Sequence, residues 1–154
     1  TLSFVFKNLE GILPAVPKAL QHEDKQLIVA ADGLLDIVRT SFDQQAFHDG
    51  LKQIWEVVAA ANRYIDQMAP WALRKTDPNR MADVLGVLLE TIRQVAILLQ
   101  PIMPNSAEQL LDQLKVKSDE RNFDRLGGAD RLIAGRKIDK PSGVFPRFSE
   151  GDAP

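Results

Sequence analysis

Apolar residues recur along this chain at intervals of three or four, which is the spacing of one face of an α-helix. This pattern predicts helices over residues 2–13, 27–42, 47–68, 78–99 and 107–116. Prolines limit most of these stretches, because proline lacks a backbone donor and clashes with the preceding turn. Short connections between long amphipathic helices favour an antiparallel bundle, so the predicted fold class is all-α.

The helices over 47–68 and 78–99 have the clearest ends. Asp43 is a candidate N-cap for the first of them, and Pro70 is its predicted stop. Asp77 followed by Pro78 offers a capping residue and a proline at the first helical position of the second. That second helix is apolar nearly all round, which predicts the central, most buried helix. Gly33 falls inside the helix over 27–42, where we interpret it as a point of close helix packing.

The composition of the sequence changes after residue 116. Residues 118–132 are polar and contain Gly127-Gly128, and residues 133–154 contain three prolines and three glycines. We therefore predict a helical bundle over 1–132 and an extended C-terminal tail over 133–154. The apolar residues Val144 and Phe145, with Pro146, predict that this tail packs back on the bundle.

Length and composition narrow the possible functions. A chain of 154 residues is the size of one domain. The absence of cysteine excludes disulfides, thiolate metal sites and cysteine nucleophiles, and two histidines argue against a histidine metal site. A net charge of −2 excludes a strongly basic nucleic-acid clamp but allows a local basic patch. We find no membrane-spanning run and no signal peptide, so we expect a cytoplasmic protein.

Reaction machinery is missing from the sequence. There is no His-Glu-x-x-His motif, no phosphate-binding P-loop and no Gly-x-Gly-x-x-Gly loop. Gly127-Gly128 is typical of a turn, and His22 lies in a polar run that predicts solvated surface. His48 beside Asp49 could be a base with an orienting acid, but neighbours on a helix do not face each other. We therefore predict no catalytic residue and no metal site in this chain.

One segment, residues 59–75, does not fit a plain bundle. Asn62 interrupts the apolar stripe of its helix, and it must either find partners inside the core or face a groove. Pro70 and Trp71 follow the predicted helix end, and proline stiffens the loop that carries the indole. Trp71 is then either a stacking platform for a nucleic-acid base or a lid on the end of the bundle.

Residues 62–80 are mildly basic within an acidic chain. Arg63 precedes Trp71, and Arg74, Lys75 and Arg80 follow it, which supports a few phosphate contacts. Single-stranded RNA loops are bound by splaying bases onto aromatic and arginine planes, a mode that suits an aromatic, an amide and basic residues together. The residues alone leave two functions open, an RNA-loop site or a protein–protein module with Trp71 as its anchor.

The motifs Asn62–Ile65 and Ala69–Lys75 strongly resemble the anticodon-binding helical domain of methionyl-tRNA synthetases of the bacterial type. Residues 135–138 and 144–147 resemble the end of that domain, and Leu2–Phe4 its start, so the resemblance covers essentially the whole chain. The class I synthetases for valine, isoleucine, leucine and cysteine share the bundle but match this combination less well. An equivalent domain of one of them is therefore the third alternative.

This resemblance implies a role for each residue of the segment. Trp71 stacks on the first anticodon base, the C of CAU, and Pro70 holds the indole in place. Asn62 and Asp66 lie on or near the face that meets the anticodon, where Asp66 either repels wrong anticodons or is an ordinary solvated charge. The basic members of the predicted site are Arg63 at the anticodon and Arg74 and Lys75 as weak phosphate contacts.

The resemblance also implies a larger parent enzyme, which ligates methionine to its tRNA with ATP. The partners expected are the anticodon loop of methionine tRNA and the catalytic domain of the parent, with no membrane and no DNA. No cofactor is expected in this chain; ATP and magnesium are expected in the catalytic domain. An asparagine and an arginine of the family's first helix align before Thr1. We therefore expect a fragment that is inactive alone and binds RNA weakly.

Overall fold

The computed structural model describes residues 1–128 and 130–145. Within these residues no strand forms, and a single antiparallel bridge joins Ile12 to Lys137. The predicted all-α class is confirmed. The helices are α1 (Leu2–Asn8), α2 (His22–Asp32), α3 (Leu34–Asp43), α4 (Phe47–Met68), α5 (Pro70–Thr76), α6 (Pro78–Leu99) and α7 (Pro104–Gln113), followed by the 3₁₀ helices η1 (Ser118–Glu120) and η2 (Phe123–Arg125).

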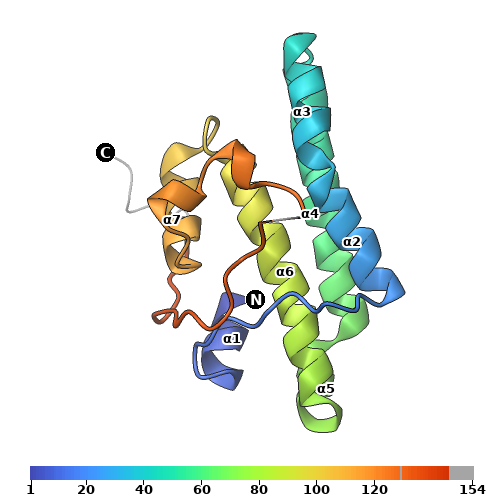
Figure 1. Ribbon diagram of the computed structural model, residues 1–154, viewed down its shortest axis with the longest axis vertical. Helices are drawn as coiled ribbons and strands as arrows, with labels where there is room; N and C mark the ends of the chain where they lie inside the picture. The colour runs from blue at the N-terminus through green and yellow to red at the C-terminus, as the bar shows by residue number, and fades with distance from the viewer. Residues whose placement is uncertain (129, 146–154) are drawn as a thin grey trace, which may run out of the picture.

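Helix α6 lies at the centre of the molecule, between α2 and α4 on one side and α1 and α7 on the other (Figure 1). Sixteen of its 22 residues are buried, which confirms the prediction of a central helix. One apolar cluster joins α6 to α2, α3 and α4, and a second joins it to α1 and α7. Its start is as predicted, because Asp77 accepts a hydrogen bond of 2.9 Å from the Arg80 amide and Pro78 is the first helical residue.

Three of the predictions about the N-terminal half are wrong. Residues 27–42 belong to two helices, α2 and α3, which meet at Gly33. A Cβ at Gly33 would lie 3.5 Å from the nearest atom, the Val29 carbonyl oxygen, so no close packing requires glycine there. Asp43 is the last residue of α3, and Ala46 precedes α4 instead, because the chain reverses at Gln45 with a positive φ of 60°.

The start of the predicted C-terminal tail pairs with the segment after α1. The Leu13 amide donates to the Arg136 carbonyl at 2.9 Å, and the Ile138 amide donates to the Gly11 carbonyl at 2.8 Å. Ile138 is buried in the apolar cluster that joins α6 to α1 and α7. Farther on, Phe145 is 65% exposed, and Pro146 and the remaining tail residues lie outside the described part of the chain.

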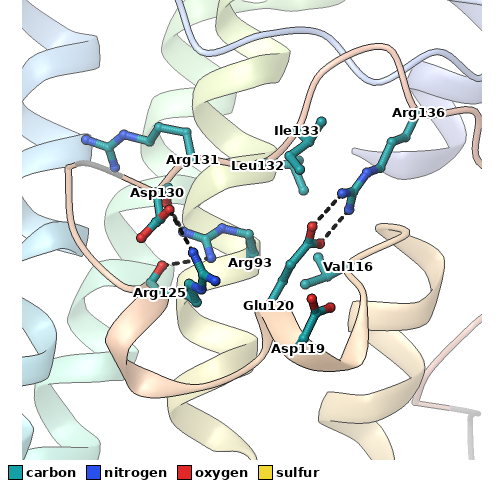
Figure 2. Close-up of a pocket in the computed structure, with 10 residues that line it drawn as sticks. All are labelled: Arg93, Val116, Asp119, Glu120, Arg125, Asp130, Arg131, Leu132, Ile133 and Arg136. Atoms are coloured by element: carbon teal, nitrogen blue, oxygen red, sulfur yellow. Dashed lines mark hydrogen bonds and ion pairs between the residues drawn. The ribbon is translucent and has the colours of Figure 1, made fainter.

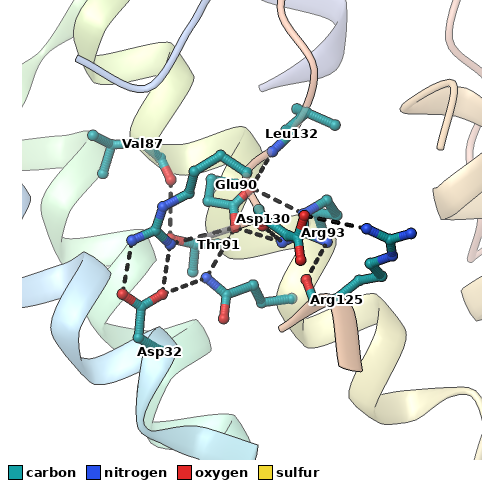
Figure 3. A network of polar contacts seen from close by, with 10 residues as sticks. Asp32, Val87, Glu90, Thr91, Arg93, Arg125, Asp130 and Leu132 are labelled. Carbon is teal, nitrogen blue, oxygen red and sulfur yellow. Dashed lines mark hydrogen bonds and ion pairs between the residues drawn. The ribbon is translucent and has the colours of Figure 1, made fainter. Parts of the chain in front are cut away.

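A buried ion pair on α6 anchors the segment before this pairing (Figure 3). Arg93 donates to both carboxylate oxygens of Glu90, at 2.9 and 2.8 Å, and both side chains are at most 4% exposed. Glu90 also accepts a hydrogen bond of 2.7 Å from the Leu132 amide, while Arg93 donates to the carbonyls of Arg125 and Asp130. The pair therefore fixes Arg125, Asp130 and Leu132 against the centre of the bundle.

Candidate nucleic-acid interface

The candidate site is built on the corner between α4 and α5. Ala69 adopts the left-handed conformation, with φ 43° and ψ 61°, which costs a non-glycine residue roughly 1–2 kcal/mol. The corner is closed by hydrogen bonds from the Ala69 amide to the Ile65 carbonyl at 3.0 Å and from the Ala72 amide to the Ala69 carbonyl at 2.8 Å. Pro70 is buried and occupies the first position of α5, where its fixed φ suits a helix.

Trp71 lies in the first turn of α5. The prediction that Pro70 ends the preceding helix is right, but the predicted loop around Trp71 is wrong, because proline at a first helical position starts a new helix. The indole is 52% exposed, so it is not a buried lid. A helix-borne, half-exposed ring next to a buried proline can offer one face to a ligand.

Asn62 and Asp66 lie one helical turn apart on α4, and both are exposed. Asn62 lines a groove of about 420 Å³ between α4, α6 and α7. Of the two alternatives for its amide, burial in the core or a position facing a groove, the structure shows the second. Most of the other groove residues are apolar, among them Trp55, Val58 and Ile65. The groove thus has one amide on its α4 wall, on the same side of α4 as Asp66.

The predicted basic residues do not gather at one place. Arg63 lines a smaller hollow between α2 and α4, away from the groove that Asn62 lines. Arg74 is exposed and donates to the Asn8 amide oxygen at 3.1 Å, and Lys75 is exposed. Arg80 adds no unpaired charge to this segment, because its guanidinium is paired with Asp24 at 2.7 Å.

A buried polar cluster near this corner was not predicted from the sequence. Asp24 has no exposed surface, and it accepts hydrogen bonds from the Tyr64 hydroxyl at 2.5 Å and from both terminal nitrogens of Arg80 at 2.7 Å. Burial raises the pKa of Asp24, but these donors outweigh it and keep that pKa below its usual range. Burial and the Asp24 carboxylate raise the pKa of Tyr64, so its hydroxyl keeps its proton. A tyrosine in an apolar row needs a buried partner, and this was the available signal.

The chain is similar to one family of proteins in both sequence and structure. A family model described as "Anticodon binding domain of methionyl tRNA ligase" matches residues 14–153. The chain belongs to this family. The methionine–tRNA ligase of Rhizobium meliloti (strain 1021) is 46% identical over 153 residues, and that of Brucella suis biovar 1 (strain 1330) is 47% identical over 153 residues. These alignments cover 99% of this chain but 30% and 29% of those proteins, so the chain spans under a third of their length.

Solved members of the methionyl-tRNA ligase family share the fold. The apo form of Mycobacterium tuberculosis methionyl-tRNA synthetase matches with a TM-score of 0.89 at 40% identity, over 96% of this chain and 30% of that one. The same enzyme in complex with methionyl-adenylate matches with a TM-score of 0.90 at 41% identity, over 95% and 29%. The family match decides against the alternative of an equivalent domain from another class I synthetase.

The histidines of this family member lie on its surface. His22 is exposed, as predicted. The prediction that His48 and Asp49 do not meet is wrong, since the imidazole Nε2 lies 3.0 Å from a carboxylate oxygen. These side chains are 85% and 58% exposed, so the pair is solvated. Among the described residues no three His, Asp or Glu side chains gather as metal ligands would, and no helix there could cross a bilayer.

A further hollow, of about 150 Å³, is lined by several arginines, as an anion site would be (Figure 2). Each arginine already has a carboxylate partner within 3.3 Å. The pairs are Arg93 with Glu90, Arg125 with Asp130, Arg131 with Asp32, and Arg136 with Glu120. This hollow therefore joins the C-terminal segment to the bundle and offers no surplus of positive charge from these four side chains.

One of these pairs predicts a pH-dependent stability. Hydrogen bonds of 2.6 Å from Arg136 lower the pKa of Glu120 from 4.5 to about 2. Since the pKa of Glu120 is lower in the folded state than in the unfolded state, the pair stabilises the fold fully above about pH 4.5. This stabilisation is lost as the pH falls toward 2. We expect the difference in melting temperature between the wild type and Glu120→Gln to be constant above pH 5 and to shrink below it. A difference that stays constant down to pH 2.5 would contradict this.

Proposed function

We propose that this chain recognises the CAU anticodon of methionine tRNA, as part of a ligase that joins methionine to that tRNA with ATP. The observation that carries the proposal is the half-exposed Trp71 indole, held by the left-handed Ala69 and the buried Pro70 in a member of this family. Stacking one base on an aromatic side chain contributes about 1–3 kcal/mol by alanine substitution. Such stacking is the usual way in which proteins bind unpaired RNA bases.

The neighbouring residues suit this function. In the proposed complex, Asn62 hydrogen-bonds a base edge from the groove wall, and Asp66 repels anticodons whose acceptor groups face it. Arg63, Arg74 and Lys75 add weak phosphate contacts, and the net charge of −2 fits a site that relies on base contacts more than on charge. ATP and magnesium act in the catalytic part of the ligase, and we assign them no residue of this chain.

The proposal predicts that Trp71→Ala weakens binding of a CAU anticodon stem-loop by about 5- to 150-fold, which corresponds to 1–3 kcal/mol of lost stacking. The measurement is a titration of the RNA against the ligase that carries this domain, at one fixed salt concentration. Trp71→Phe keeps a flat ring and should retain a large part of the affinity.

The matched control is Phe47→Ala, which removes another exposed aromatic ring from the opposite end of α4, about 30 Å away along the helix. It should bind the RNA as the wild type does. Unchanged affinity and unchanged CAU preference in Trp71→Ala would refute the proposal. If a protein partner competed at Trp71 while RNA had no effect, the protein–protein module would be the better description.

A further inference from the structure

The buried carboxylate of Asp24 connects three helices close to the candidate site. It belongs to α2, its tyrosine partner Tyr64 belongs to α4, and its arginine partner Arg80 belongs to α6. A fourth donor, the Gln21 amide at 3.1 Å, completes the set around the carboxylate. Each contact has a direction as well as a distance, so the cluster fixes the orientation of the three helices more narrowly than apolar packing would.

This cluster holds both ends of the segment that carries Trp71. Only Ala69, the seven residues of α5 and Asp77 separate α4 from α6. Tyr64 lies in the last two turns of α4, and Arg80 lies in the first turn of α6. Arg80 also contacts the sulfur of Met68, the final residue of α4, at 3.5 Å. A single guanidinium therefore ties the residue before the α4–α5 corner to the residues after α5.

Apart from this cluster, helix α5 is held mainly by its packing against α6. It is seven residues long, and isolated helices of that length are unstable in water. Pro70 is its one buried residue, and Leu73 is partly buried between the two apolar clusters. Its contact with α1, from Arg74 to Asn8, is exposed to solvent. The direction of Trp71 thus depends on how α4 and α6 are held.

Stability alone does not explain an ion pair at this position. Removing two charges from water has a large desolvation cost, and apolar residues of similar volume often stabilise a core as well or better. Directional hydrogen bonds add what apolar packing lacks, a single arrangement of the groups they join. A recognition site benefits from that arrangement, because a side chain already in its bound orientation loses less freedom when the ligand arrives.

We propose that Asp24, Tyr64 and Arg80 are positioning residues for anticodon recognition, which hold α5 so that the Trp71 indole is oriented for stacking before RNA binds. The inference deepens the proposed function and depends on it. None of the three side chains needs to touch the RNA. Their effect passes through the α4–α5 corner and should appear in the affinity for the anticodon and in the freedom of the indole.

The decisive variant is Tyr64→Phe, which removes one hydroxyl and keeps the ring in the core. We expect a 3- to 10-fold loss of affinity for the CAU stem-loop and a larger loss for Asp24→Asn, which also weakens the bidentate contact with Arg80. Within residues 1–154, Trp55→Phe leaves Trp71 as the sole tryptophan, and the fluorescence anisotropy of this chain should decay faster in Tyr64→Phe than in the parent. In the ligase, KM for tRNA should rise, while kcat and methionine-dependent exchange of pyrophosphate into ATP stay unchanged.

The matched control for Asp24→Asn is Glu120→Gln, which also changes a carboxylate to an amide. Its bidentate arginine pair involves neither α4, α5 nor α6. It should destabilise the fold without changing RNA affinity or the motion of Trp71. The proposal is overturned if folded Tyr64→Phe binds the CAU stem-loop like the wild type while Trp71→Ala loses affinity. If the wild type shows no CAU preference and Trp71→Ala no loss, the proposed function itself fails. Should Asp24→Asn not fold, Tyr64→Phe still decides.

Discussion

Replacing Glu90 with alanine should lower the free energy of unfolding by about 3–5 kcal/mol, the usual result of removing one partner from a buried ion pair. Arg93 would remain inside the bundle at 3% exposure, with no carboxylate from this pair to offset its charge. The Leu132 amide would also lose its acceptor, and an unsatisfied buried amide adds its own desolvation cost. The measurement is equilibrium unfolding in urea, monitored by circular dichroism.

The control for this prediction is Glu56→Ala, an exposed glutamate in the interior of α4. Since alanine is the best helix former and this side chain is solvated, the stability should change by less than about 0.5 kcal/mol. Limited proteolysis adds a local test, because the chain at Arg125, Asp130 and Leu132 should become cleavable in Glu90→Ala before the helices do. Equal stability in the two variants would show that Arg93 finds another partner or reaches solvent.

The long helices could be predicted from the sequence because their apolar spacing persists over many turns. For α4 and α6 the proline and capping signals also gave the correct boundaries, with the exception of the Asp43 cap. Helix α5 could not be found in this way, because seven residues contain less than two turns of periodicity. The break at Gly33 was missed for a related reason: α2 and α3 share one apolar stripe, and the stripe continues across the break.

Some residues of the candidate site could be predicted from the sequence, and others could not. Trp71 and Asn62 stood out because each departs from the local pattern, one as an aromatic after a helix end and the other as an amide on an apolar stripe. Asp24 gave no such signal, since a carboxylate in the first turn of a helix is an ordinary surface feature. Its burial depends on Tyr64 and Arg80, 40 and 56 residues away, so that only the folded structure brings the three together.

Substituting alanine for Gly86 should also be strongly destabilising, at or above the upper end of the ~1–3 kcal/mol that overpacking costs. A Cβ on this residue of α6 would lie 2.2 Å from the carbonyl oxygen of Ala15 and 2.8 Å from its carbonyl carbon. Both are backbone atoms, which cannot rotate away as a side chain would. Ala15 lies between Pro14 and Pro17, whose fixed φ angles stiffen the segment between α1 and α2 where it crosses α6. The steric cost should therefore exceed any gain in helix propensity.

Gly33→Ala is the matched control, because the same methyl group is added to a glycine that lies between two helices. Its φ of −79° is an ordinary helical value, and the new Cβ would be in normal van der Waals contact. We expect stabilisation by about 0.4–1 kcal/mol, since alanine restricts the unfolded chain more than glycine does. The two variants should thus shift the melting temperature in opposite directions. A change of melting temperature of the same sign in both variants would mean that the segment around Ala15 moves aside, and that α6 does not require glycine at this crossing.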